Sequence, residues 1–191
     1  MRTSITTCAT AALLFLAGPA LAGDFDEALT ALANGKLAEV SADPALIEAI
    51  RAQNAAHSSL AEGDIDALDK SWRAQVGQGS APMIDEVAGK PASARLIAIR
   101  DEAGGMFTEI FAMDDKGLNV AQSDVTSDYW QGDEDKWQQT YLVGAGAVHI
   151  SEVELDDSTQ TYQSQVSVTV VDPETNAPIG AITFGINVDA L

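Results

Sequence analysis

The chain has 191 residues, of which 29 are acidic and 10 are basic, so its formal net charge is −19 at pH 7. A surface of this charge repels phosphate backbones and anionic lipid, which argues against nucleic acid as a partner. The single cysteine, Cys8, lies near the N-terminus.

The first 22 residues have the pattern of a secretory signal peptide. Arg2 supplies a positive charge, residues 8–18 are apolar, and residues 20–22 (Ala-Leu-Ala) form a small-x-small cleavage site. We therefore expect cleavage after residue 22 and a periplasmic chain, with retention as an N-terminal anchor as the alternative. Residues 23–191 suffice for one domain with a sizeable core. No later segment is apolar and long enough to cross a membrane.

Residues 24–104 have apolar residues at helical spacing. Asp43 followed by Pro44 is a strong start signal, because an Asp caps the first turn and Pro suits the first helical position. The helices are expected to begin at Asp24, Pro44 and Asp64 and to cover residues 82–87 and 93–102. Residues 24–104 therefore form the helical part of the domain.

From Met106 onward the apolar residues alternate with polar ones, as in Val166 to Val170. This period of two is typical of antiparallel strands with one more polar face. The expected strands are 106–113, 117–122, 147–155, 160–171 and 180–188. A helical part over 24–104 and a sheet part over 106–191 predict one α+β domain covering residues 23–191.

Two segments carry a resemblance to a known family. Asp114–Gly117 is a D-x-x-G turn, and Val120–Ser123 reads V-x-x-S. Near the end, Asp172-Pro173 forms a turn that leads to Ile179-Gly180 and the last strand. In this order and spacing, residues 90–191 resemble the extracytoplasmic PAS-like sensor domains called Cache or PDC domains.

The resemblance implies N-terminal helices packed on a five-stranded antiparallel PAS-like sheet. It also implies a stand-alone secreted sensor domain, because the sequence stops at Leu191 directly after the last expected strand. Such a domain would lack its own output module and would act through a membrane receptor, a sensor kinase or another partner. The N-terminal helices, which often pair in this family, offer a surface for a homodimer.

The loop after the second strand holds the candidate binding residues. Aromatic rings beside polar groups provide apolar area and fixed hydrogen bonds, which a small-molecule pocket needs. We expect Tyr129, Trp130 and Trp137 to enclose a small polar metabolite, with Asp128 or Asp133 accepting from an ammonium group and Lys136 pairing with a carboxylate. Ser123, which ends V-x-x-S, completes the set that the resemblance places at the ligand. The alternative is that the rings fill the gap between loop and sheet.

The same residues point away from catalysis and metal binding. The run Asp133-Glu134-Asp135 places consecutive acids in different directions, which does not suit Ca²⁺. His57 and His149 are the only histidines, and residues 23–191 contain no cysteine, so a His-rich zinc site and a cysteine nucleophile are excluded. We expect no catalytic residues, no metal, no cofactor and no enzymatic activity. The alternative to a sensor is an accessory interaction protein whose PAS-like fold binds no ligand.

Overall fold

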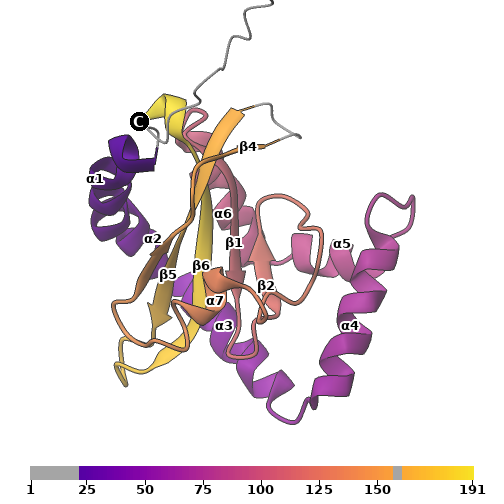
Figure 1. The fold of residues 1–191 in the computed structure, drawn as a ribbon. Helices are drawn as coiled ribbons and strands as arrows, with labels where there is room; N and C mark the ends of the chain where they lie inside the picture. The colour runs from indigo at the N-terminus through magenta and orange to yellow at the C-terminus, as the bar shows by residue number, and fades with distance from the viewer. Residues whose placement is uncertain (1–21, 157–160) are drawn as a thin grey trace, which may run out of the picture.

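A computed structural model describes residues 22–156 and 161–191 of the chain (Figure 1). Apart from Ala22, the predicted signal peptide lies outside the described residues. Within those two ranges, no helix combines the length and the apolarity that crossing a membrane requires.

The second half of the chain forms a six-stranded antiparallel sheet in the order β2-β1-β6-β5-β3, with β4 also paired to β5. The strands are β1 (Phe107–Met113), β2 (Asn119–Gln122), β3 (Val148–Ile150), β4 (Glu154–Asp156), β5 (Thr161–Val171) and β6 (Pro178–Asn187). The α+β class and the antiparallel sheet predicted from the sequence are confirmed.

The strand predicted over residues 147–155 is interrupted, and β3 and β4 are its two parts. Both pair with β5, on either side of Ser151. The Ser151 hydroxyl accepts a hydrogen bond from the Gln165 amide at 2.8 Å, and the Ser164 hydroxyl donates to the Ser151 carbonyl at 2.8 Å. Side chains thus replace part of the backbone ladder at this point, which explains the interruption.

The helical half contains α1 (Ala22–Leu32), a π-helical segment (Ala33–Leu37), α2 (Ala38–Ser41), α3 (Pro44–His57), α4 (Glu62–Gln75), α5 (Pro82–Ala88) and α6 (Pro91–Glu102). As predicted, α3 begins at Pro44, and the Asp43 carboxylate accepts from the Ala45 amide at 2.9 Å. The cap at α4 uses Asp64, whose carboxylate accepts from the Ala61 amide at 2.9 Å.

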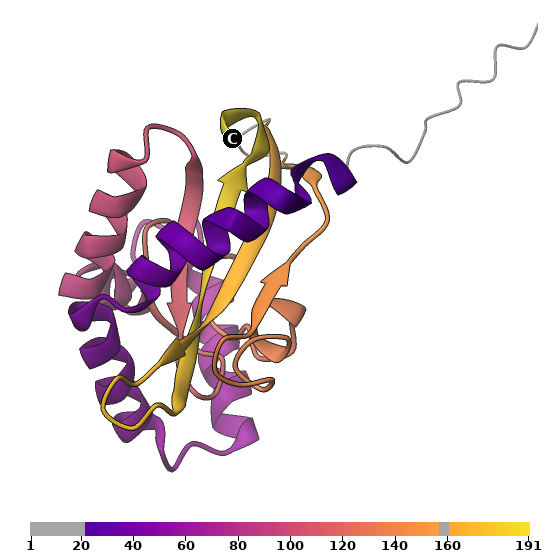
Figure 2. The same ribbon diagram turned by 90° about the vertical axis from the view of Figure 1, so that its left-hand side faces the viewer.

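Helices α1, α3 and α6 cover one face of the sheet and form the main core with it (Figure 2). Side chains at alternate positions of β1, β5 and β6 point into this core, including Ile110, Val168 and Phe184. The alternation seen in the sequence therefore reflects one face of each strand packing against the helices. The intervening positions face the opposite side, where the chain between β2 and β3 lies.

The opposite face of the sheet is covered in part by the short helix α7 (Asp135–Gln138). A small cluster joins Phe111, Met113 and Ala181 of the sheet to Trp137 of α7. Towards β5 this face is polar: the hydroxyls of Ser167 and Thr183 are buried and lie 2.9 Å apart. This face of the sheet therefore carries an apolar cluster under α7 and a buried hydroxyl pair between β5 and β6.

The turn between β5 and β6 is tied to α3 by one bidentate ion pair. The Arg51 guanidinium donates to both carboxylate oxygens of Asp172, and the Glu174 amide donates to the same carboxylate. The hydrogen bond from Arg51 is the main cause that lowers the pKa of Asp172 to about 2. This pKa lies below the unfolded value, so the pair stabilises the fold above about pH 4 and the stabilisation is lost as the pH falls towards 2.

Replacing Arg51 with methionine should therefore make the protein less resistant to acid. We expect the midpoint of acid unfolding, followed by circular dichroism, to move to higher pH, while Lys70→Met on the exposed surface of α4 leaves the midpoint in place. An Asp172 pKa near 4 in the unchanged protein, measured by NMR, would contradict this explanation.

Candidate functional site

The predicted D-x-x-G turn is organised around the buried carboxylate of Asp114. One oxygen accepts from the Lys116 and Leu118 amides at 2.9 Å each. The other accepts from the Gln53 side chain at 3.0 Å and from Nδ1 of His57 at 2.9 Å. The carbonyl of Asp114 also accepts from the Trp137 indole at 3.1 Å. The turn therefore fixes α3 on one side and the α7 aromatic ring on the other.

Glycine is required at the end of this turn. Gly117 has φ of +80°, and a Cβ atom there would lie 2.5 Å from the Cα of Gly132. Gly132 packs equally closely, because a Cβ on it would meet the Trp130 indole. These two close approaches bring the loop after β2 back over the turn.

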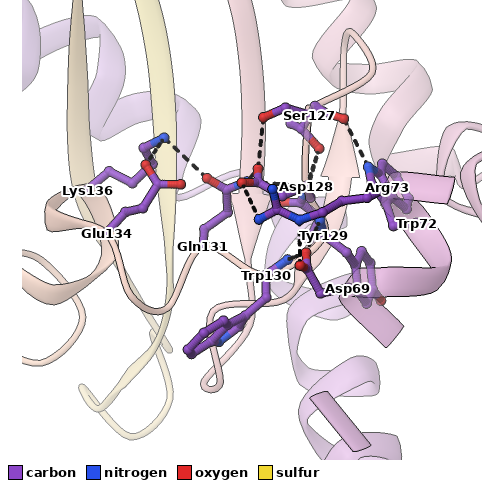
Figure 3. A network of polar contacts seen from close by, with 12 residues as sticks. Asp69, Trp72, Arg73, Ser127, Asp128, Tyr129, Trp130, Gln131, Glu134 and Lys136 are labelled. Atoms are coloured by element: carbon purple, nitrogen blue, oxygen red, sulfur yellow. Dashed lines mark hydrogen bonds and ion pairs between the residues drawn. The ribbon is translucent and has the colours of Figure 1, made fainter. Parts of the chain in front are cut away.

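The first half of the loop is anchored to α4. The Asp69 carboxylate accepts from the Tyr129 amide at 2.9 Å and the Trp130 amide at 3.0 Å, and Arg73 donates to Asp69 at 2.6 Å (Figure 3). Burial of Asp69 raises its pKa, but these hydrogen bonds outweigh burial, and the net pKa is lowered. Asp69 thus stays ionised and holds the loop backbone in place.

The aromatic residues in this half of the loop pack against α4. The Tyr129 ring is 5% exposed and stacks on Trp72 with the ring centroids 5.2 Å apart. Burial is the main cause that raises the pKa of Tyr129. The Trp130 indole is half-buried and donates to the Lys116 carbonyl at 2.9 Å. Their binding role stays a prediction, and the structure gives both rings partners within the protein.

A polar network runs from α4 to α7 through the predicted residues. Arg73 donates to Asp128 at 3.0 Å, and the Gln131 amide donates to the same Asp128. The Lys136 ammonium group then donates to the Gln131 side-chain oxygen at 3.2 Å (Figure 3). Asp128 and Lys136 are therefore joined through Gln131, a residue that the sequence analysis did not select.

Lys136 is held in place over the face of the sheet opposite the main core. Its ammonium group lies 2.8 Å from a Glu134 carboxylate oxygen and 5.5 Å from the centroid of the Phe111 ring. Next to it, Trp137 is 8% exposed and stacks on Tyr141 at a centroid distance of 5.0 Å. The charge of Lys136 and the ring of Trp137 thus have defined positions without a ligand.

An open hollow of about 380 Å³ lies between α7 and the β3–β5 edge of the sheet. Its lining residues are Asp133, Glu134, Asp135, Lys136, His149, Ser151 and Gln165. Asp133 and Lys136 were predicted from the sequence to bind a ligand. Trp137 lies beside the hollow in α7.

The sheet side of this hollow was not predicted from the sequence. His149 pairs with Ser167 on β5, and Ser167 is on the polar face. The alternation of polar and apolar residues along the strands indicates that one sheet face is polar. Only the pairing register between β3 and β5 brings His149 and Gln165 next to α7. Ser123, in contrast, lies at the end of β2, where its hydroxyl accepts from the Ile110 amide at 2.7 Å.

The hollow combines three carboxylates with one ammonium group, Lys136. Its volume lies within the range of small-molecule sites, and its charged groups suit a polar ligand that carries an amine. Among residues 22–156 and 161–191, no group of three acidic, histidine or cysteine side chains is arranged to hold a metal ion.

No family model matches the chain, and no curated protein matches its sequence. Solved structures do match. The sensor domain of the V. cholerae histidine kinase DctB is 13% identical, with a TM-score of 0.47 over 86% of this chain and 54% of that chain. The ligand-binding domain of the Campylobacter jejuni chemoreceptor Tlp3, in complex with 4-methylisoleucine, is 9% identical, with a TM-score of 0.39 over 74% of this chain and 57% of that chain.

A third similar structure is the ligand-binding domain of the Pseudomonas aeruginosa amino acid chemoreceptor PctC in complex with GABA. It is 12% identical, with a TM-score of 0.36 over 65% of this chain and 52% of that chain. This chain thus spans between half and two thirds of the length of these three solved chains. Helices on one face of an antiparallel sheet in the order β2-β1-β6-β5-β3 agree with the α+β fold that the resemblance to the Cache class implies.

Proposed function

We propose that this protein is a sensor-type domain that binds a small polar metabolite in the hollow between α7 and the β3–β5 edge. The observation that carries the proposal is the fixed position of Lys136 at this hollow. Its ammonium group is held by Glu134 and Gln131 over the Phe111 ring. Because these contacts exist before binding, little conformational entropy is lost when a ligand arrives.

The charges of the lining favour a ligand that carries an amine. In this proposal Asp133 accepts from the ligand ammonium, and Lys136 contacts a carboxylate or another acceptor on the same ligand. Trp137 packs on the sheet and on Tyr141, and so holds α7 beside the hollow. Asp128, Tyr129 and Trp130 hold the loop through the contacts with α4, and Ser123 joins the end of β2 to β1.

The proposed setting is the periplasm, and the proposed partner is a membrane receptor or sensor kinase. The pattern of residues 1–22 supports export. The network from Lys136 through Gln131 and Asp128 to Arg73 connects the hollow to the surface of α4. A partner docked on α4 would therefore contact the element that holds the binding loop.

A thermal-shift screen tests the binding proposal. A panel of amines, amino acids and organic acids should contain an amine-bearing compound that raises Tm in a saturable manner. At a concentration of one hundred times Kd the rise should be about 5 to 10 °C for a domain of this size. Lys136→Met and Asp133→Asn should abolish the shift, because each removes a charge that the proposal places against the ligand.

Lys70→Met is the matched control for Lys136→Met, because it removes the same charge from an exposed site on α4. It should retain the full shift. If no compound stabilises the protein, or if Lys136→Met responds as strongly as the unchanged chain, the proposed site is wrong.

The second candidate function is that of an accessory interaction protein. It is favoured by an exposed apolar tip between α7 and β3, where Leu142 and Val143 are 61% and 66% exposed. This function predicts no ligand-dependent change in Tm and a protein partner whose binding is lost when Leu142 and Val143 are both replaced with serine.

A further inference from the structure

A second hollow lies on the helical side of the molecule, between α3 and the junction of α5 with α6. Its volume is about 440 Å³. One wall is a stripe of alanines on α3, and the other is formed by Pro91 and Ala92. The alanines are Ala45, Ala49, Ala52 and Ala56, which recur every three or four residues and so lie on one helix face. Their short side chains leave the groove open and apolar.

Lys90 gives this apolar groove a positive charge. Its ammonium group donates to the Gln53 side-chain oxygen at 3.0 Å, and among the described residues it has no ion-pair partner. An ammonium group has three donors, so two remain for a further acceptor. Burial is the main cause that lowers the pKa of Lys90, against the attraction of Glu86 and Asp114. A ligand anion would therefore improve the environment of this charge.

His57 contributes a second polar group at the same end of the groove, and its ring donates to a carboxylate there when both ring nitrogens are protonated. Its Nδ1 atom lies 2.9 Å from the buried Asp114 carboxylate, and its ring lines the groove. The carboxylate fixes the ring orientation, so the Nε2 atom on the other side of the ring is left for a ligand. Gln53 links both groups, because it accepts from Lys90 and donates to Asp114 at 3.0 Å.

We propose that this groove is a second ligand site, which binds small monocarboxylates with an apolar body. The carboxylate lies between Lys90 and His57, and the apolar body lies on the alanine stripe of α3. Glu48 and Glu86 also line the groove. Their negative charges disfavour a second carboxylate on the ligand. Neither Lys90 nor His57 lines the hollow beside α7, so this proposal stands independently of the proposed function.

An NMR titration of the ¹⁵N-labelled chain tests the proposal with acetate, butanoate, hexanoate and 3-phenylpropanoate. Shift changes should be saturable and confined to α3 and the α5–α6 junction. Affinity should rise with apolar length, to a Kd in about the millimolar range for hexanoate. Hexan-1-ol, which has the apolar body without the charge, should not bind.

Lys90→Met should weaken hexanoate binding about tenfold or more, because it removes the charged donor and keeps the side-chain length. Ala52→Leu should block binding by filling the groove, at an exposed position where leucine suits a helix. Lys70→Met should bind as the unchanged chain does. The proposal is overturned if no carboxylate saturates, if hexan-1-ol binds equally well, or if Lys90→Met binds hexanoate with unchanged affinity.

Discussion

Replacing Asp114 with alanine is expected to lower the free energy of unfolding by about 3 to 5 kcal/mol. The carboxylate is fully buried and accepts from the Lys116 and Leu118 amides, from Gln53 and from His57. Removing it leaves these donors without an acceptor inside the protein. Urea unfolding followed by circular dichroism measures the loss.

Asp114→Asn and a control on the exposed surface test whether the lost hydrogen bonds cause this change in the free energy of unfolding. Asp114→Asn keeps an oxygen for the two turn amides but places an amide group against Gln53, so its loss should be smaller than that of the alanine variant. Asp66→Ala removes an exposed carboxylate that pairs with Lys70 on α4, and it should change the free energy of unfolding by no more than about 0.5 kcal/mol. If Asp114→Ala lowers the free energy of unfolding by as little as Asp66→Ala does, the hydrogen bonds of Asp114 do not stabilise the fold as we expect.

Replacing Trp72 with alanine should cost about 3 to 5 kcal/mol of unfolding free energy. Trp72 is fully buried in the cluster that joins α4 and α5 to the loop, and it stacks on Tyr129. Its indole also donates to the Thr126 carbonyl at 2.9 Å. The variant therefore creates a cavity and removes one anchor of the loop after β2.

Trp72→Phe retains an aromatic ring but leaves the Thr126 carbonyl without its donor, so its loss should be intermediate. Val76→Ala, at the end of the same helix and 36% exposed, is the control and should cost far less. Urea unfolding of the three variants provides the comparison. Similar values for Trp72→Ala and Val76→Ala would mean that α4 contributes little to holding the loop.

The fold was predictable where the signal is local. Asp43 and Pro44 mark the start of α3 through capping chemistry that needs no distant partner. The alternation around Val166–Val170 assigns one strand face to the core. The interruption between β3 and β4 was not predictable in this way, because it depends on a hydrogen bond between Ser151 and Gln165.

The site was predictable only in part, for a similar reason. Composition identified the loop after β2 and two lining residues, Asp133 and Lys136. It did not show that Tyr129 would stack on Trp72, because these residues are far apart in the sequence and meet only when α4 packs on the loop. Nor did it place His149 at the hollow, because that depends on the register between β3 and β5.

The central claim is that a small polar ligand occupies the hollow between α7 and the β3–β5 edge. An NMR titration of the ¹⁵N-labelled chain with the most stabilising amine-bearing compound tests it most directly. We expect saturable shift changes centred on Lys136, His149 and Gln165, with the Kd that the thermal shifts give. Shift changes confined to the α3 groove, or none at these three residues, would contradict the claim.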